Sequence, residues 1–161
     1  MILRDPVHGL VEFETDEEDI VAALLEAGEV QRLRRIRQLG LASLAYPGAD
    51  HTRFSHAIGA AFVMTRFIRR MRQVHDALPF WQRVTTERAR DALAAALLHD
   101  VGHGPFSHLF EEALPNGPRH ETWTSRIILD PDTDVHRILP RSDSTLPERV
   151  AELVHGRHEL T

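Results

Sequence analysis

The sequence predicts an all-α domain, and three observations lead to that class. Apolar residues recur at helical spacing along most of the chain, whereas the alternation typical of strands is confined to the first 16 residues. Glycine and proline fall between the helical stretches, as expected at helix ends. The 161 residues are 42% hydrophobic and 27% charged, which suits one domain with a single core. We therefore expect one helical bundle over residues 1–161, with at most a small hairpin at its N-terminus.

The N-terminal segment is expected to hold this hairpin and a first helix. A turn at His8-Gly9 leads into a short alternating stretch over Leu10–Phe13. Asp16 is suited to cap the helix that follows, because its side chain can accept a hydrogen bond from the first helical turn. This helix should run to about Ala27, with Gly28 closing it.

The next two helices are predicted from their apolar stripes. A helix over 30–39 should end at Gly40, and its stripe consists of Val30, Leu33, Ile36 and Leu39. Tyr46-Pro47-Gly48 then predicts a loop. From about Arg53 a long helix follows, whose inner face is expected to hold Phe54, Ile58, Ala61, Phe62, Met64, Thr65 and Ile68.

The second half of the chain predicts four more helices. One begins at Thr86, buries a Leu/Ala face and ends at Val101-Gly102. The buried face of this helix is expected to hold Leu93, Ala94, Leu97 and Leu98. Shorter helices are expected over Phe106–Ala113, Glu121–Leu129 and Glu148–His155, with prolines breaking up the tail between them.

The composition limits the chemistry. No cysteine is present, so disulfides and thiolate metal sites are excluded, and any metal must be held by His, Asp or Glu. No apolar run approaches the roughly 20 residues of a membrane span, and the N-terminus lacks the apolar stretch of a signal peptide. We therefore expect a cytoplasmic protein with no membrane contact.

The net charge of −5 argues against general nucleic-acid binding. Every basic residue is Arg, which suits phosphate contacts, although biased codon usage is the simpler explanation.

The placement of the histidines carries the functional prediction. The helix that ends near residue 98 delivers His99 and Asp100 at its C-terminal end, where the helix dipole also favours a cation. Imidazole and carboxylate donors suit a borderline divalent metal ion. A third ligand should come from another helix, and His56 is the best candidate because the small residues Ala57, Gly59 and Ala60 let two helices approach closely. A single histidine beside a helix is more often just hydrogen-bonded, so the prediction depends on the three occurring together.

Five motifs in this order resemble those of the HD-domain phosphohydrolases, and in particular the deoxynucleoside triphosphate triphosphohydrolases that include the SAM-and-HD-domain enzyme. The motifs are DPVHG (residues 5–9), QRLRRIRQLG (31–40), YPGA (46–49), RFSH (53–56) and HDVGHGPFSH (99–108). The resemblance covers residues 5 to about 125 and implies an HD-domain helical bundle. The tail after about residue 130 matches no motif of the family.

The resemblance implies a metal-dependent hydrolysis. His56, His99 and Asp100 would hold one divalent transition metal ion, such as Fe, Mn, Zn or Ni, with Mg as a further option. The metal neutralises phosphate charge and lowers the pKa of bound water. Water would attack the α-phosphorus of a deoxynucleoside triphosphate, and the products would be a deoxynucleoside and triphosphate. The fourth metal ligand of the family, an Asp farther along the chain, has no match before residue 161.

The resemblance also implies roles beside the metal. His108 would be the general acid that protonates the leaving oxygen, because imidazole titrates near neutral pH. His103 and His120 would complete the cluster near the phosphates. Glu111 could orient His108 or raise its pKa, although relatives often have Asp there. Arg53 would be a phosphate clamp; a solvent-exposed arginine is the alternative.

Two further sets of residues match functional positions of relatives. Gln38 and Leu39 match positions that read the sugar, where Leu crowds a 2′-hydroxyl and so favours deoxynucleotides; Leu39 also fits the core stripe of its helix. Glu26, Gln31 and Arg34 match a regulatory guanine-nucleotide site of tetrameric relatives, with Glu26 in place of Asp.

Three interpretations therefore compete. The chain is a deoxynucleotide triphosphohydrolase or its N-terminal part, an HD hydrolase of another nucleotide phosphate ester, or a non-catalytic nucleotide-binding module that lacks the fourth metal ligand. In each of them a nucleotide is the expected partner, and a homo-oligomer is compatible with all three. We expect the N-terminal part, or a shortened form, of a longer enzyme.

Overall fold

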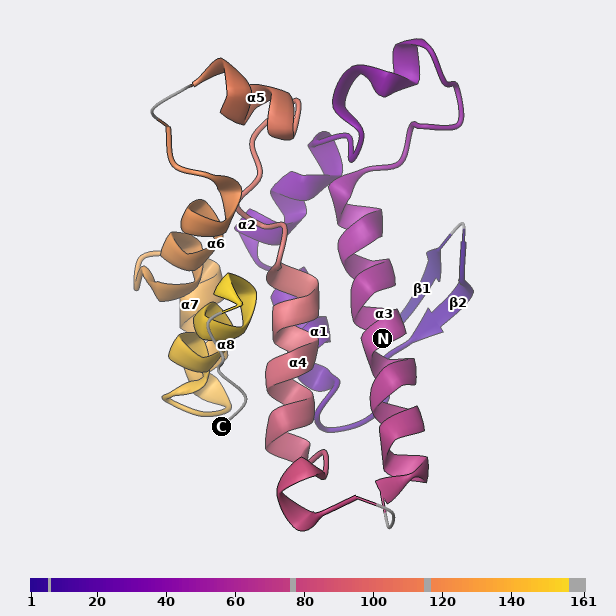
Figure 1. Ribbon diagram of the computed structural model, residues 1–161, viewed down its shortest axis with the longest axis vertical. Helices are drawn as coiled ribbons and strands as arrows, with labels where there is room; N and C mark the ends of the chain where they lie inside the picture. The colour runs from indigo at the N-terminus through magenta and orange to yellow at the C-terminus, as the bar shows by residue number, and fades with distance from the viewer. Residues whose placement is uncertain (6, 76–77, 115–116, 157–161) are drawn as a thin grey trace.

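A computed structural model of the chain describes residues 1–5, 7–75, 78–114 and 117–156 (Figure 1). Within these ranges the chain forms eight α-helices, several short 3₁₀ turns and one two-stranded hairpin. The all-α prediction is confirmed. Pro6, which belongs to the first sequence motif, lies outside the described residues.

The hairpin consists of β1 (Ile2–Asp5) and β2 (Gly9–Glu12), which pair antiparallel with Leu3 opposite Val11. The predicted small hairpin is therefore confirmed. Val11 is completely buried and joins the main hydrophobic core. The hairpin thus packs by one face against the helices, next to α3 (Figure 1).

The segment after the hairpin folds into α1 (Asp19–Leu25), α2 (Gly28–Gln31) and the 3₁₀ turn η1 (Arg32–Arg35). The prediction that Gly28 closes the first helix is wrong, because Gly28 begins α2 and its amide donates to Asp134 Oδ2 at 3.2 Å. The predicted helix over 30–39 is also too long. Ile36 is extended, the 3₁₀ turn η2 (Gly40–Leu44) follows, and Leu39 is exposed instead of completing the core stripe.

The centre of the molecule is a pair of helices, α3 (Arg53–Gln73) and α4 (Thr86–Leu98), which run side by side in opposite directions (Figure 1). Thr52 caps α3 and Thr85 caps α4, each by accepting a backbone amide proton with its hydroxyl. Small buried side chains allow the close approach of the two helices. They include Ala57, Ala61, Ala89 and Ala94.

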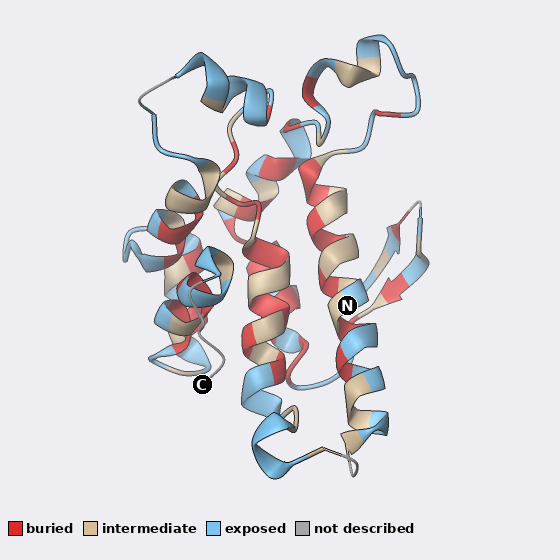
Figure 2. Cartoon of the chain, in the orientation of Figure 1, coloured by how far each residue is buried: buried red, intermediate tan, exposed pale blue. Residues whose placement is uncertain are grey.

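Four further helices follow α4 in the chain. They are α5 (His108–Ala113), α6 (His120–Leu129), α7 (Asp134–Ile138) and α8 (Leu146–His155), with the 3₁₀ turn η5 (Leu139–Arg141) before α8 and η4 (Phe80–Gln82) in the α3–α4 connection. The short helix α7 was not predicted. Figure 2 shows buried residues along the facing sides of α3 and α4, whereas α5 and the η2 loop stand out exposed at one end. Across the described ranges, no helix combines the length and apolarity that crossing a membrane requires.

Candidate metal centre

His56, His99 and Asp100 converge from the two central helices. His56 lies one turn into α3, and His99 and Asp100 directly follow α4. The Nε2 atoms of His56 and His99 are 3.2 Å apart. The carboxylate of Asp100 lies 3.7 Å from the first and 3.5 Å from the second. Ligand atoms at about 2.0–2.2 Å from one cation stand roughly 3–3.5 Å from one another, so this spacing fits a shared metal ion.

Local hydrogen bonding gives His99 the form that a metal requires. Its Nδ1 lies 2.9 Å from the carbonyl oxygen of Ala96. A carbonyl only accepts, so Nδ1 carries the proton, and the lone pair of a neutral ring is on Nε2, the atom that faces His56. Metal-binding histidines are commonly oriented by such a bond from the other ring nitrogen. The donor set therefore fits a divalent cation.

Asp100 is the most constrained of the three side chains. Burial opposes its ionisation, but the hydrogen bond from His103 and the charges of His99 and Arg53 outweigh burial and hold the pKa of Asp100 well below its ordinary value. The carboxylate is therefore ionised at neutral pH. Arg53, at the first position of α3, donates to Asp100 Oδ2 and is only 2% exposed. The alternative of a solvent-exposed Arg53 is therefore wrong.

The two imidazoles border an open pocket. Burial lowers the pKa of His56 below its ordinary value, so its ring is neutral at neutral pH. His56 and His99 both line a pocket of about 700 Å³ between the hairpin and α3. The small residues Gly59 and Ala60 line this pocket too, so they do not lie between α3 and α4 as expected. His8 and His51 also line it and were not predicted as part of the site.

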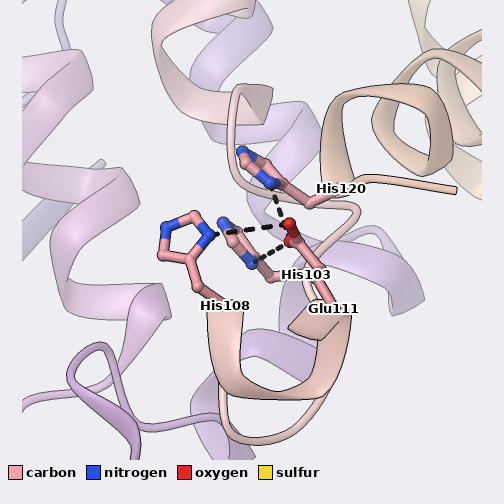
Figure 3. A group of neighbouring side chains, drawn as sticks. All are labelled: His103, His108, Glu111 and His120. Atoms are coloured by element: carbon pink, nitrogen blue, oxygen red, sulfur yellow. Dashed lines mark hydrogen bonds and ion pairs between the residues drawn. The ribbon is translucent and has the colours of Figure 1, made fainter. Parts of the chain in front are cut away.

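A second cluster of metal-type side chains lies beside the first. It consists of His103, His108, Glu111 and His120 (Figure 3), and we call it the Glu111 cluster. His120 Nδ1 lies 2.9 Å from Glu111 Oε1. His103 Nδ1 lies 3.6 Å from the same oxygen, and His108 Nδ1 lies 3.6 Å from Glu111 Oε2. The His103 and His120 rings are stacked, with centroids 3.8 Å apart. All four predicted residues therefore come together.

His103 joins the Glu111 cluster to the first site. Its Nε2 lies 3.4 Å from Asp100 Oδ1, and its side chain is 1% exposed. Burial lowers the pKa of His103 below its ordinary value. Burial also opposes the ionisation of Glu111, but the hydrogen bond from His120 and the nearby histidine charges lower the pKa of Glu111 overall. Glu111 is therefore an anion among imidazoles.

The turn between His103 and His108 has an unusual backbone. Phe106 and Ser107 have φ angles of 65° and 56°, in the left-handed region that costs roughly 1–2 kcal/mol per non-glycine residue. The Ser107 hydroxyl lies 3.3 Å and 3.1 Å from the carbonyl oxygens of Arg37 and Gln38. This contact ties the loop of His108 to the loop of Gln38.

The remaining predicted residues, the sugar contacts and the regulatory set, lie outside the two clusters. Gln38 has a buried side-chain oxygen without a hydrogen-bond partner among the described residues, and its neighbour Leu39 is 52% exposed. Arg34 donates to Gln31 at 2.7 Å and stacks on a core phenylalanine ring, whereas Glu26 lines a separate pocket beside α7. Gln31 and Arg34 line a different pocket from Glu26.

Comparison with known proteins supports a phosphohydrolase site. A model of the HD domain matches residues 53–161. The deoxynucleoside triphosphate triphosphohydrolase SAMHD1 of Bos taurus is 35% identical over 127 residues. An uncharacterized protein of Bacillus subtilis, YwfO, is 39% identical over 153 residues. A crystal structure of a phosphohydrolase from Bacteroides thetaiotaomicron superposes with a TM-score of 0.76 at 30% identity, over 99% of this chain.

These relatives are much longer than the chain. The matches include 95% of this chain but 33% of the Bacillus protein, and 76% of this chain but 20% of the bovine enzyme. The Bacteroides structure is matched over 36% of its length. The chain thus corresponds to between a fifth and about a third of each of these proteins.

Proposed function

The chain belongs to the HD domain family of phosphohydrolases, and from that premise we propose that it hydrolyses deoxynucleoside triphosphates in a metal-dependent reaction. The observation that supports this most directly is the convergence of His56, His99 and Asp100 on one point. The similarity to the bovine triphosphohydrolase favours this substrate class over other phosphate esters. The proposal covers two cases. In one, this chain is a shortened enzyme that is active alone; in the other, it is the N-terminal part of a longer enzyme.

His56, His99 and Asp100 would hold one divalent ion. Two imidazoles and one carboxylate suit Fe, Mn, Zn or Ni, with Mg as a further option. The ion would supply neutralisation of phosphate charge and a lowered pKa of water. Arg53 holds Asp100 by one nitrogen, while its buried Nε has no hydrogen-bond partner among the described residues. We assign Arg53 to the clamping of a substrate phosphate, and its unpaired Nε is the donor available for this contact.

His108 is the proposed general acid. In the reaction the oxygen of a water molecule bonds to the α-phosphorus and the water loses a proton, while the bond from phosphorus to the 5′-oxygen breaks and the 5′-oxygen takes a proton. His108 is 66% exposed and thus accessible to substrate, and Glu111 lies 3.6 Å from its Nδ1. The carboxylate of Glu111 would orient the imidazole. His103 and His120 would face the phosphates from the same cluster.

Gln38 and Leu39 are the proposed sugar contacts. The buried, unpaired side-chain oxygen of Gln38 needs a donor, such as a hydroxyl of the sugar. Leu39 is an exposed apolar side chain next to it, available to crowd a 2′-hydroxyl. Glu26, Gln31 and Arg34 are the proposed contacts of a regulatory nucleotide. A homo-oligomer and a cytoplasmic location belong to the same proposal, and light scattering and cell fractionation would test them.

The proposal is tested by product analysis. Protein depleted of metal and reloaded with Mn²⁺ is incubated with each deoxynucleoside triphosphate, and products are separated by chromatography. We expect a deoxynucleoside and triphosphate in equal amounts. Release of orthophosphate or pyrophosphate would instead indicate an HD hydrolase of another ester type. Nucleotide binding without turnover with any metal would indicate a non-catalytic module.

His108→Ala tests the acid. We expect a loss of turnover of about 10²–10⁴-fold, the usual contribution of a general acid, with the metal content unchanged. His136→Ala is the matched control, since His136 is hydrogen-bonded by its ring to the Ile128 carbonyl on α6. An unchanged rate in His108→Ala would remove His108 from the mechanism.

A further inference from the structure

The connection between α3 and α4 exposes two adjacent aromatic side chains to which the proposed function gives no role. Phe80 and Trp81 begin the 3₁₀ turn η4 and are 80% and 71% exposed. Aromatic side chains of this size dominate cores and interfaces, because burying one removes a large apolar area from water. Two neighbours exposed to this degree on one short turn therefore indicate a contact surface.

The protein itself satisfies most of the backbone around these two side chains, in residues 78–84, which we call the tip. Arg88 donates to the carbonyl oxygens of Trp81 and Arg83. Arg83 donates to that of Leu78 at 3.3 Å. Hydrogen bonds reach the carbonyl oxygens of Leu78, Pro79, Phe80, Trp81, Arg83 and Val84. A segment can enter the apolar part of a lipid surface only when its backbone polar groups are paired, and the tip largely meets this condition.

The tip lies in a positively charged part of the chain. Residues 66–90 include seven arginines and two acidic residues, whereas the whole chain has a net charge of −5. The bonds of Arg83 and Arg88 go to carbonyl oxygens, and Arg70 donates to the side-chain oxygen of Gln73. None of these bonds neutralises a guanidinium charge. The surroundings of the two aromatic side chains are thus complementary to anionic headgroups.

The place of the tip favours a lipid surface over a nucleic-acid strand. Figure 1 shows the α3–α4 connection at one end of the molecule, opposite α5 and the η2 loop. His56 lies 17 residues before the last residue of α3, or about 25 Å along a helix that rises 1.5 Å per residue. A single strand is bound in a charged groove with aromatic side chains along it. A projecting turn instead suits a broad surface, and contact there leaves the candidate metal centre open to solvent.

We propose that the tip binds anionic membranes, with Phe80 and Trp81 inserted at the level of the headgroups. Arg70, Arg83 and Arg88 face the phosphate and carboxylate groups of the lipids. The expectation of no membrane contact came from the lack of a spanning segment, and a surface contact needs none. The inference requires neither a bound metal nor a particular substrate, so it holds whether or not the chain hydrolyses deoxynucleoside triphosphates.

Vesicle sedimentation tests the proposal. The protein is mixed with phosphatidylcholine vesicles that contain or lack phosphatidylserine, and the bound fraction is measured at increasing salt. We expect binding to the anionic vesicles that weakens as salt rises. The double variant Phe80→Ser/Trp81→Ser should bind roughly tenfold more weakly or worse, because it has lost the apolar contact. Arg70→Gln should bind about fivefold more weakly.

Two further variants complete the experiment. Tyr46→Ser removes an aromatic side chain that is 70% exposed in the loop after η2 and should bind as the parent does. Trp123→Phe leaves Trp81 as the single tryptophan, whose emission should shift to shorter wavelength when anionic vesicles are added. Circular dichroism verifies that each variant is folded.

Three results would overturn the proposal. The first is a parent protein that does not sediment with anionic vesicles at low salt. The second is equal binding of the parent and the folded double variant. The third is binding of a fluorescent single-stranded oligonucleotide, but not of vesicles, that the double variant loses; this would assign the tip to nucleic acid. Because vesicle binding is the readout, failure of the proposed hydrolase activity is distinguished from failure of this inference.

Discussion

Asp100 contacts more of the site than any other single side chain. Arg53 donates to one of its oxygens, and the rings of His99 and His103 lie 3.5 Å and 3.4 Å from the other. These neighbours hold the pKa of Asp100 down despite burial. An ionised, fixed carboxylate is available to a cation without first losing a proton.

Asp100→Ala should therefore abolish uptake of the metal held with His56 and His99, as measured by elemental analysis. It should also destabilise the metal-free protein by about 3–5 kcal/mol, because buried Arg53 is left without its carboxylate. Asp100→Asn keeps the shape of the side chain and separates the two effects. Full metal content in a folded variant would contradict the assignment of Asp100 as a ligand.

Arg53→Ala should weaken the binding of triphosphates. Hydrogen bonds to charged groups contribute about 1.5–3 kcal/mol, or roughly ten- to a hundredfold in affinity. Isothermal titration with a non-hydrolysable deoxynucleotide measures the effect. Arg66→Ala, an exposed arginine farther along α3, is the matched control and should bind normally. Equal affinities for the two variants would leave Arg53 with a role toward Asp100 alone.

The sequence predicts which side chains form the site better than it predicts their contacts. The histidines and Asp100 could be identified because the five motifs are dense and ordered. The bond from His99 to the Ala96 carbonyl and the contact between His103 and Asp100 could not, because side-chain orientation depends on the final turn of α4 and the packing around it. Likewise, Glu111 lies nearer to His120 than to His108, the partner expected from helical spacing.

At the scale of elements, the turn after α4 is what brings the two clusters together. A Cβ added at Gly102 would lie 2.3 Å from both the His120 carbonyl oxygen and the Thr124 amide nitrogen. The Gly102 amide also donates to Thr124 Oγ1 at 3.0 Å. Glycine at this position therefore allows the chain to touch the first turns of α6, which places His103 against His120.

Gly102→Ala should push α6 away from this turn. We expect a loss of roughly 1–3 kcal/mol, the usual cost of overpacking, and a fall in melting temperature by about 2–4 °C per kcal/mol. Gly48→Ala is the control, because a Cβ there meets nothing within 4 Å. Equal melting temperatures for the two variants would contradict this role of Gly102.

Element prediction was accurate where apolar periodicity is long and failed where helices are short. The 21-residue helix α3 and the 13-residue helix α4 were located closely from their stripes. Helix α7 has only five residues, too few to display a period. Val30, Leu33 and Ile36 are buried as predicted. The backbone there forms α2 and a 3₁₀ turn instead of one continuous helix, so Leu39 does not lie on the same buried face.

At the scale of the whole molecule, α8 closes the bundle against α4 and α6. Arg149 on α8 makes two hydrogen bonds of 2.8 Å and 2.9 Å to Asp91 on α4 and another of 2.9 Å to Asp143. The backbone amide of Thr145 and the Arg149 side chain lower the pKa of Asp143 to about 2. The carboxylate thus joins the start of α8 to the charge network.

This network makes a specific contribution to acid stability. Because the pKa of Asp143 is lower in the folded chain than the ordinary 3.8, its contribution is complete above pH 3.8 and is lost as pH falls through about 2. The melting temperature of Asp143→Asn should therefore lie below that of the parent at pH 6 and approach it near pH 2. Asp132→Asn, at a 94% exposed carboxylate, should differ little at any pH. A constant difference between Asp143→Asn and the parent would exclude this linkage.

How far the family resemblance extends along the chain is the property of the whole molecule that is hardest to predict from the sequence. Motifs end near residue 125, and the bundle nevertheless continues to α8 with an ordinary buried core that includes Leu139, Leu146 and Val150. Core residues are chosen for volume and apolarity, which many sequences satisfy. The tail could therefore be predicted as helical but carries no recognisable motif, although the HD domain model extends over it to residue 161.

The Ser107 hydroxyl, which reaches the carbonyl oxygens of Arg37 and Gln38, makes two distant segments of sequence a single mechanical unit. A side chain at Gly40 would meet the Phe106 carbonyl oxygen at 3.2 Å, so the same two segments also touch through their backbones. Substitutions that shift one segment will displace the other. If Gln38 and His108 have the proposed roles, substitutions that alter sugar preference and proton transfer are subject to epistasis, so the effects of changes in one segment will not add to those in the other.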